Sequence, residues 1–179
     1  MMQEIERVLI SEEALQARIQ ELGRELARDY EGKCPVFVGV LKGVILFFAD
    51  MIRATPIRSQ IDLMAVSSYG AGTESTGRIV LKKDVSLDLR GRHVVILEDI
   101  IDSGLTLKYT VEHLKEMEPA SLKICTLLDK PARRTVEVNA DYIGFTIPNE
   151  FVVGYGLDYN DYYRNLPFIG VLKPEVYEH

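Results

Sequence analysis

The chain lacks the features that mark several common protein classes. Its 179 residues carry 27 acidic and 21 basic side chains, a net charge of −6, so it has no basic excess of the kind that sequence-independent nucleic-acid binding requires. The longest apolar stretch, residues 43–49, is too short to cross a bilayer. The first ten residues, MMQEIERVLI, contain no apolar segment typical of a signal peptide. We therefore expect a soluble, cytoplasmic protein that binds neither nucleic acid nor a membrane.

Cysteine is scarce, and two common nucleotide-binding signatures are missing. Cys34 and Cys125 lie far apart, no CxxC occurs, and neither position has metal-ligand spacing, so we favour two buried free thiols over a disulfide. The Walker A pattern GxxxxGK[ST] and the dinucleotide pattern GxGxxG are both absent. A phosphate site in this chain must therefore be built in another way.

The apolar pattern predicts helices and strands in alternation. Ser11 is a candidate N-cap, and the helix after it has an apolar face made of Leu15, Ile19, Leu22 and Leu26. Further helices are expected at residues 44–54 and 104–118, and strands at 35–41, 61–67, 78–84, 93–99, 121–130, 141–148 and 151–159. This alternation predicts one α/β domain over residues 1–179 with a mostly parallel sheet. Residues 68–77, rich in glycine and hydroxyl side chains, are expected to form a mobile flap.

One stretch, HVVILEDIIDSGLTL at residues 93–107, joins an apolar strand to a helix and carries a strong chemical signal. In an open α/β sheet, ligands collect at the carboxyl ends of the strands, where this junction lies. The helix N-terminus offers free N–H groups and a partial positive charge. Ser103 and Thr106 add hydroxyl donors, and Gly104 permits close approach of the backbone to an anion. These features predict a phosphate-binding loop that contains no lysine.

Three carboxylates beside this loop need a separate explanation, because they would repel a phosphate. Carboxylates accept hydrogen bonds from hydroxyls and bind hydrated Mg²⁺, so Glu98 and Asp99 indicate a sugar diol and therefore a ribose phosphate. Asp102 directly precedes the loop and is placed to move a proton near the anomeric side of that sugar. The alternative is that Asp102 only caps the helix, while Glu98 and Asp99 are solvated at the strand end.

The order of an apolar strand, two acids, two apolar residues and Asp-Ser-Gly-Leu-Thr resembles the phosphoribosyl-pyrophosphate motif of the type I phosphoribosyltransferases. Four more segments resemble, in the same order, the hypoxanthine(-guanine) phosphoribosyltransferases of that family: VLKGVILFFADM, SSYG, LLDKPARR and FVVGYGLDYNDYYRNLPFIGVL. The resemblance covers most of residues 36–172. It implies the type I phosphoribosyltransferase fold, a mostly parallel central sheet flanked by helices, with a small hood and a flexible flap loop.

The resemblance implies an enzyme of purine salvage. Such an enzyme transfers the 5-phosphoribosyl group from phosphoribosyl pyrophosphate to N9 of hypoxanthine, and also of guanine, giving IMP or GMP and pyrophosphate. Mg²⁺ is the implied cofactor, since it neutralises the departing pyrophosphate. The bases are 6-oxopurines, because a lysine donor favours a carbonyl over an amino group. By analogy with the family we also expect a homodimer or homotetramer.

The matching positions assign residues to each part of the substrates. The 5′-phosphate is assigned to Asp102, Ser103, Gly104, Leu105 and Thr106, and Asp102 is also the implied catalytic base or acid at purine N7. The ribose hydroxyls are assigned to Glu98 and Asp99, and Mg²⁺ to Glu98, Asp99 and Asp158. Pyrophosphate is assigned to Lys42, Gly43 and Arg164, and the purine to Lys130, Phe151, Val152 and Asp158. Ser68 and Tyr69 match the flap loop that closes over the site.

Three further points follow from the match. The family often has a cis peptide at the position of Leu41 and Lys42. Asp161 is a candidate surface partner of Arg164. Asp129 stands where many relatives have an apolar or other residue, and it is assigned no role.

Two functional alternatives stay open within the same fold. One is an enzyme that prefers guanine or xanthine, because base preference depends on backbone contacts near purine C2, around Val152 and Asp158. The other is a regulator that senses phosphoribosyl pyrophosphate and binds nucleic acid. It is disfavoured because the chain is acidic and about as long as the fold alone.

Overall fold

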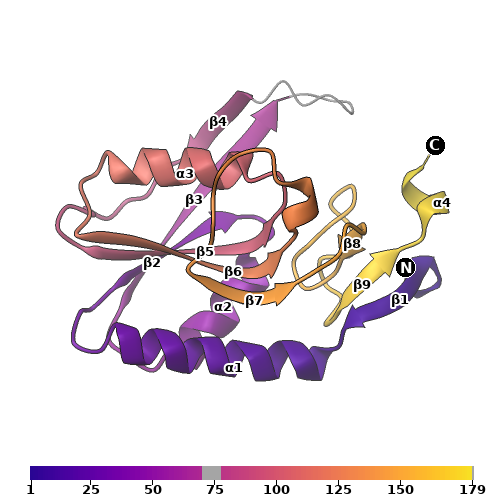
Figure 1. The fold of residues 1–179 in the computed structure, drawn as a ribbon, viewed down its shortest axis with the longest axis horizontal. Helices are drawn as coiled ribbons and strands as arrows, with labels where there is room; N and C mark the ends of the chain where they lie inside the picture. Colours follow the sequence, from indigo (N-terminus) through magenta and orange to yellow (C-terminus); the bar gives the residue numbers. More distant parts are fainter. Residues whose placement is uncertain (70–77, 179) are drawn as a thin grey trace.

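Two sheets form the fold, which the computed structural model describes over residues 1–69 and 78–178. The larger sheet has the strand order β4-β3-β2-β5-β6-β7 and the smaller has the order β1-β9-β8 (Figure 1). The strands are β1 (Ile5–Ile10), β2 (Val36–Leu41), β3 (Gln60–Tyr69), β4 (Arg78–Lys83), β5 (His93–Ile101), β6 (Ser121–Asp129), β7 (Tyr142–Thr146), β8 (Val152–Val153) and β9 (Ile169–Leu172). The helices are α1 (Glu12–Asp29), α2 (Ile45–Ala54), α3 (Leu105–Lys115) and α4 (Pro174–Tyr177), with 3-10 turns η1 (Met2–Glu4) and η2 (Pro131–Arg133).

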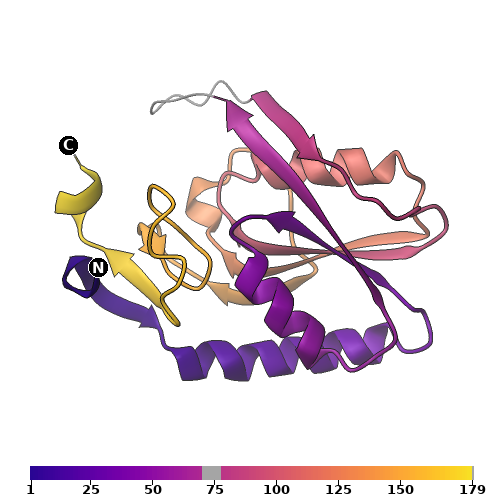
Figure 2. The same ribbon diagram turned by 180° about the vertical axis from the view of Figure 1, so that it is seen from behind.

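The larger sheet is parallel except at one edge. β3, β2, β5, β6 and β7 run parallel, whereas β4 pairs antiparallel with β3. Helices α1 and α2 pack on one face and α3 packs on the other (Figures 1 and 2). Because both faces are covered, the inner strands are near-continuous apolar runs such as VFVGVL in β2. The predicted α/β architecture with a mostly parallel sheet is confirmed.

The longest helix, α1, begins where its cap predicts. Ser11 Oγ accepts a hydrogen bond from the backbone N–H of Ala14 at 3.2 Å, which satisfies one of the free donors of the first turn. The predicted apolar face is fully buried against α2 and the sheet: Leu15, Ile19, Leu22 and Leu26. Local capping and helical periodicity therefore agree with the tertiary packing.

The smaller sheet forms the hood, and its strand β8 is shorter than predicted. β9 pairs antiparallel with both β1 and β8, so residues near the two ends of the chain meet in one sheet (Figure 1). The strand predicted at residues 151–159 is wrong beyond Val153, because the backbone turns there. Gly154, Tyr155 and Gly156 have φ values of 100°, 48° and 98°, which are incompatible with an extended strand.

The strand that leads to the predicted flap is longer than its sequence pattern suggests. Ser68 pairs with Ile79 and Tyr69 pairs with Arg78 in the β3–β4 ladder. The backbone of both residues therefore belongs to a strand, and the prediction that they lie in a loop is wrong. Serine and tyrosine are compatible with a pleated strand, and the antiparallel partner supplies their hydrogen bonds. The rest of the predicted flap, residues 70–77, lies outside the described residues.

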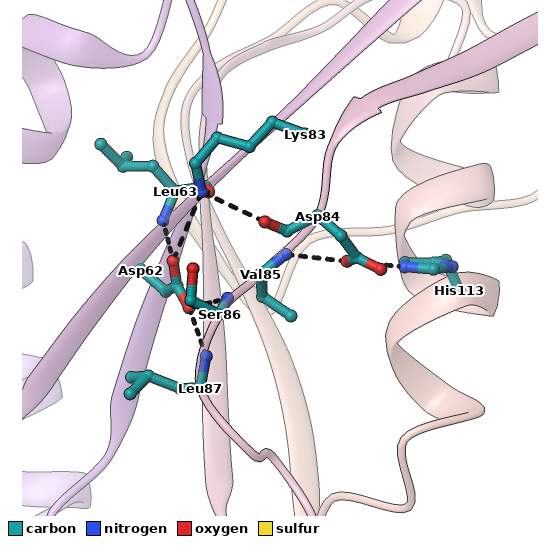
Figure 3. Close-up of polar contacts among 8 residues, drawn as sticks. All are labelled: Asp62, Leu63, Lys83, Asp84, Val85, Ser86, Leu87 and His113. Carbon is teal, nitrogen blue, oxygen red and sulfur yellow. Dashed lines mark hydrogen bonds and ion pairs between the residues drawn. The ribbon is translucent and has the colours of Figure 1, made fainter.

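The chain that returns from β4 is anchored by one carboxylate of β3. Asp62 accepts hydrogen bonds from the backbone N–H groups of Leu63, Ser86 and Leu87 at 2.8, 2.6 and 2.8 Å (Figure 3). Lys83 Nζ lies 3.8 Å from the same carboxylate. These contacts fix the base of the β3–β4 hairpin.

A second contact ties the end of β4 to α3. Asp84 Oδ1 accepts a hydrogen bond from the N–H of Val85 at 2.8 Å and lies 2.9 Å from His113 Nε2 (Figure 3). His113 is on α3, so the same helix that begins at the predicted phosphate loop also contacts the hairpin.

The two cysteines carry free thiols, as expected. Cys125 is fully buried and Cys34 is partly exposed, so the expectation of burial holds for Cys125 alone. Within the described residues, no helix is both long enough and apolar enough to cross a membrane.

Candidate active site

Two adjoining cavities open at the carboxyl ends of the parallel strands. Their volumes are about 710 and 250 Å³, and both are lined by Asp99, Ile100, Asp102 and Asp158. The larger cavity is also lined by Lys42, Gly43, Ser68, Glu98, Ser103, Gly104, Thr106 and Arg164. The smaller one is lined by Lys130, Phe151 and Val152. The structure thus brings the residues assigned from the sequence to one place, with two exceptions. Leu105 is not part of either cavity wall, and only the backbone of Tyr69 is described.

Strand β5 extends two residues beyond Glu98 and Asp99, where the sequence predicted that it would end. Ile100 and Ile101 continue the parallel pairing with Leu128 and Asp129 of β6, so the predicted strand end at Asp99 is two residues early. The acidic side chains had marked the strand end in the sequence, but the backbone ladder continues past them. The turn that follows β5 is therefore short, and α3 starts directly after it.

Gly104 forms the N-cap of α3 with a φ of 87°. A Cβ atom at this position would lie 2.6 Å from Val138 Cγ1, so a side chain is excluded by space as well as by backbone conformation. The first N–H groups of a helix have no acceptor within the helix, and Ser103 and Thr106, which flank the start of α3, line the larger cavity. This arrangement fits a bound phosphate.

Two carboxylates of β5 are held in an environment that disfavours their charge. Burial raises the pKa of Glu98 well above its ordinary value, and the neighbouring Asp99 raises it further. Burial also raises the pKa of Asp99 to about 6, although the N–H of Ile100 and the Arg164 guanidinium act in the opposite direction. Glu98 Oε1 is buried and has no hydrogen-bond partner among the described residues. Such groups gain from the arrival of a cation or a hydroxyl donor.

The three carboxylates assigned to Mg²⁺ do not form a preassembled metal site. No group of three or more His, Cys, Asp or Glu side chains has metal-binding geometry within residues 1–69 and 78–178. Asp158 is engaged by Arg164 Nη2 at 2.9 Å and by the N–H of Asp161 at 2.8 Å. Mg²⁺ usually takes one or two protein carboxylates and completes its shell with water and substrate phosphates. The unpartnered Glu98 and the adjacent Asp99 therefore fit a Mg²⁺ that arrives with a phosphorylated substrate.

The two cations assigned to pyrophosphate, Lys42 and Arg164, are joined through one carboxylate, that of Asp161. The Leu41–Lys42 peptide is cis, as the resemblance implied. Asp161 accepts hydrogen bonds from Lys42 Nζ at 2.7 Å and from Arg164 Nη2 at 2.9 Å. The suggested surface pair of Asp161 with Arg164 is present, and the same carboxylate also holds Lys42. Gly43 lies against the acids, because a Cβ there would be 1.9 Å from Asp99 Oδ2.

The smaller cavity combines a buried cation with an aromatic ring. Lys130 is 5% exposed, and its Nζ donates to the carbonyl of Glu150 at 3.1 Å and lies 3.7 Å from Asp102 Oδ2. Burial lowers the pKa of Lys130, while the nearby Asp102 opposes this shift. Phe151 stacks on Tyr177 of α4, with ring centroids 4.7 Å apart. Such a cavity suits a planar base with a carbonyl directed at the lysine.

Sequence reasoning missed several residues that support this site. Arg133 Nε lies 3.4 Å from Asp102 Oδ1, and Tyr177 stacks on Phe151. Arg134 forms an ion pair with Asp129 and contacts the backbone of the phosphate loop. The only signal for the two arginines was their position in the segment LLDKPARR, and Tyr177 had no signal at all.

The chain matches known proteins over nearly its whole length. A family model described as "Phosphoribosyl transferase domain" matches residues 9–160. The hypoxanthine-guanine phosphoribosyltransferase of Streptococcus pneumoniae is 55% identical over 174 residues, which are 97% of each chain. The protein of the same name from Bacillus subtilis is 52% identical over 99% of each chain. The "Bifunctional protein TilS/HprT" of Listeria monocytogenes is 55% identical over 97% of this chain, which spans only 27% of that protein's length.

A solved structure shows the same similarity in three dimensions. The crystal structure of a hypoxanthine phosphoribosyltransferase from Staphylococcus aureus superposes with a TM-score of 0.95 at 49% identity. The match covers 99% of this chain and 97% of that one.

Proposed function

The chain belongs to the phosphoribosyl transferase domain family, and we propose that it transfers the 5-phosphoribosyl group from phosphoribosyl pyrophosphate to N9 of hypoxanthine and guanine. The products are IMP or GMP and pyrophosphate, and the role is purine salvage. The observation that carries this proposal is the meeting of two cavities at Asp99 and Asp102. One cavity contains a phosphate loop, and the other contains a lysine and an aromatic ring. C1′ of the ribose belongs where the two cavities meet.

Each part of phosphoribosyl pyrophosphate has a place in the larger cavity. The loop from Asp102 to Thr106 receives the 5′-phosphate through its N–H groups and hydroxyls. Glu98 and Asp99 accept hydrogen bonds from the ribose hydroxyls. Lys42, Gly43 and Arg164 receive pyrophosphate. Glu98, Asp99 and Asp158 are the carboxylates that would hold Mg²⁺ when it arrives with the substrate, and the ion would supply positive charge to the leaving pyrophosphate.

The base binds in the smaller cavity. Lys130 donates to the 6-oxo group, Phe151 packs on the ring, and the backbone near Val152 and Asp158 contacts the edge near C2. As the N9–C1′ bond forms and the bond from C1′ to pyrophosphate breaks, the N7 proton leaves the purine. Asp102 is the carboxylate within reach of that proton. A protonated lysine rejects the 6-amino group of adenine, since both groups are donors.

Other properties of the protein are part of the same proposal. Residues 1–179 form a single phosphoribosyltransferase domain that assembles into a homodimer or homotetramer in the cytoplasm. Sedimentation equilibrium of the purified chain tests the assembly, and a purely monomeric protein at micromolar concentration would contradict it.

The activity is tested by mixing the protein with Mg²⁺, phosphoribosyl pyrophosphate and one of hypoxanthine, guanine, xanthine or adenine, and by quantifying the nucleotide formed. We expect IMP and GMP as the main products. Product from xanthine far above that from hypoxanthine would favour a xanthine-preferring relative. No product with any base would refute the proposal.

The role of Asp102 is tested by Asp102→Asn, which keeps the size of the side chain but removes the proton acceptor. Turnover should fall by about 100- to 10,000-fold, the range for loss of a general base, while binding of phosphoribosyl pyrophosphate is largely kept. Asp88→Asn is the matched control, because Asp88 is exposed and, within the described part of the chain, accepts one hydrogen bond, from the N–H of Arg90. Unchanged turnover of Asp102→Asn would remove Asp102 from the chemistry.

A further inference from the structure

The segment that follows β6 wraps around the back of the phosphate loop. The backbone N–H of Lys130 donates to the carbonyl of Ile101 at 3.0 Å, and Arg134 Nη2 approaches the same oxygen at 3.5 Å. Arg134 Nε donates to the carbonyl of Asp102 at 3.3 Å. The N–H and Oγ1 of Thr135 donate to the carbonyl of Ser103 at 3.0 and 3.3 Å. Three successive carbonyls of the loop are therefore engaged from one side.

This arrangement determines where the N–H groups of the loop point. A trans peptide unit is planar, and its C=O and N–H point in opposite directions. When the carbonyl of Asp102 is directed at Arg134, the N–H of Ser103 must point away from Arg134. The same holds for the N–H groups of Asp102 and Gly104, whose preceding carbonyls are also held. These residues line the larger cavity, so the donors are oriented for an anion before it binds.

Asp129 orients the guanidinium that makes these contacts. It ends strand β6 and forms an ion pair with Arg134, and each of the two side chains is 16% exposed. Arg134 Nη1 also donates to the carbonyl of Val138 at 2.7 Å. A guanidinium that is largely removed from water needs a carboxylate partner, and its planar fork then has a fixed direction. A Cβ at Gly104 would lie 3.0 Å from Arg134 Cδ, so the arginine packs directly against the loop.

We infer that Asp129 and Arg134 are positioning residues that, together with Thr135, hold the loop carbonyls away from the site so that the loop N–H groups face the 5′-phosphate. We call these three residues the carbonyl clamp. The inference rests on the proposed function and extends it to a residue, Asp129, to which the family motif gives no role. The clamp touches no substrate and acts only through the loop.

The test compares two ligands of the same cavity by titration calorimetry. Ribose 5-phosphate probes the loop, and pyrophosphate with Mg²⁺ probes the opposite part of the cavity. Asp129→Ala should weaken ribose 5-phosphate binding by about tenfold, the effect of losing one charge-assisted contact, and leave pyrophosphate binding within about twofold. Asp129→Asn keeps an acceptor for Arg134 and should recover most of the affinity. Arg134→Lys keeps the positive charge without the planar fork and should resemble Asp129→Ala.

Asp141→Ala is the matched control. Asp141 precedes the neighbouring strand β7 at the opposite end of the sheet, lies 3.3 Å from Lys123 Nζ and accepts the N–H of Ile124 at 2.9 Å. Its loss removes a carboxylate that also holds a lysine and a backbone N–H, although this pair is more exposed than that of Asp129 and Arg134. Asp141 lies away from the loop, so both affinities should stay at the wild-type values.

Equal affinity of wild type and both clamp variants, Asp129→Ala and Arg134→Lys, for ribose 5-phosphate would overturn the inference. An equal loss of affinity for ribose 5-phosphate and for pyrophosphate would also overturn it, because that result indicates a general loss of structure. Failure of the proposed function is distinguished by the wild type itself. Suppose that the wild type forms no nucleotide, yet Asp129→Ala still weakens the binding of ribose 5-phosphate. That result would refute the proposed activity but support the role of the carbonyl clamp.

Discussion

Replacement of Asp62 by asparagine is expected to destabilise the fold at the base of the β3–β4 hairpin. The Asp62 side chain is 8% exposed, and its two oxygens together accept three backbone N–H groups and face the Lys83 ammonium (Figure 3). Asparagine has the same shape but only one terminal oxygen. Its NH₂ group must therefore face a donor wherever it is placed.

The magnitude follows from the less costly of the two amide orientations. With its oxygen toward Ser86 and Leu87, the asparagine NH₂ faces the N–H of Leu63 and the ammonium of Lys83. One hydrogen bond to a charged acceptor is lost, and two others weaken from charge-assisted to neutral strength. We expect a loss of about 2–4 kcal/mol in the free energy of unfolding.

Urea unfolding at neutral pH measures this loss as a lower midpoint at constant m-value. Asp88→Asn is the control and should change the stability by no more than about 0.5 kcal/mol, as for most exposed substitutions. A loss below about 1 kcal/mol for Asp62→Asn, at unchanged m-value, would show that the three N–H contacts are not net stabilising.

The same residue predicts a pH dependence. Burial alone would raise the pKa of Asp62, but the N–H groups of Leu87, Ser86 and Leu63 outweigh it and lower the pKa below its ordinary value. The folded protein then binds fewer protons at this site than the unfolded chain. Its contribution is present above the unfolded pKa of about 3.9 and is lost as the pH falls through the folded pKa. The difference between wild type and Asp62→Asn should therefore shrink on acidification, and a difference that stays constant down to about pH 2 would contradict this reasoning.

Two further substitutions test the geometry of the site. Gly43→Ala places a Cβ 1.9 Å from Asp99 Oδ2. It should lower kcat/KM for phosphoribosyl pyrophosphate by about 10- to 100-fold with little change in melting temperature. Wild-type kinetics of this variant would show that Asp99 moves aside without consequence. Lys130→Met removes the donor for the 6-oxo group of the base. It should raise KM for hypoxanthine by about 10- to 100-fold, while KM for phosphoribosyl pyrophosphate changes little. An equal rise in KM for both substrates would contradict a specific role of Lys130 at the base.

Elements with strong local signals were predictable from the sequence. α1 has both a capping serine and a complete apolar stripe, so its start and its buried face follow from residues within a few turns of each other. The phosphate loop was predictable for the same reason, since strand, turn, glycine and helix are contiguous. Residues 151–159 failed because an apolar run carries no information about the positive φ of Tyr155. β1 and β9 have no local signal, as each depends on pairing with a strand at the other end of the chain.

The supporting contacts of the site escaped prediction for a related reason. Lys42 and Asp161 are 119 residues apart in the sequence, and Arg134 contacts a loop about thirty residues before it. A motif identifies side chains by their neighbours along the chain, whereas these contacts exist only after the sheet brings distant loops together. Residues that would contact the substrate were therefore accessible from the sequence, but most residues that hold them in place were not.

Burial distinguishes Lys42 from Arg134 among the cations around this cleft. Lys42 and its partner Asp161 are 67% and 65% exposed, so water already screens their attraction and the pair contributes little to stability. An incoming pyrophosphate can replace Asp161 at small cost. Arg134 and Asp129 are each 16% exposed, and separating them would leave an unpaired charge largely out of water. In the proposed function, the exposed Lys42 is thus available to the substrate, and the buried pair of Asp129 and Arg134 remains intact while it orients the loop. An acidic protein can in this way bind a polyanion, because only a few cations have to be released to it.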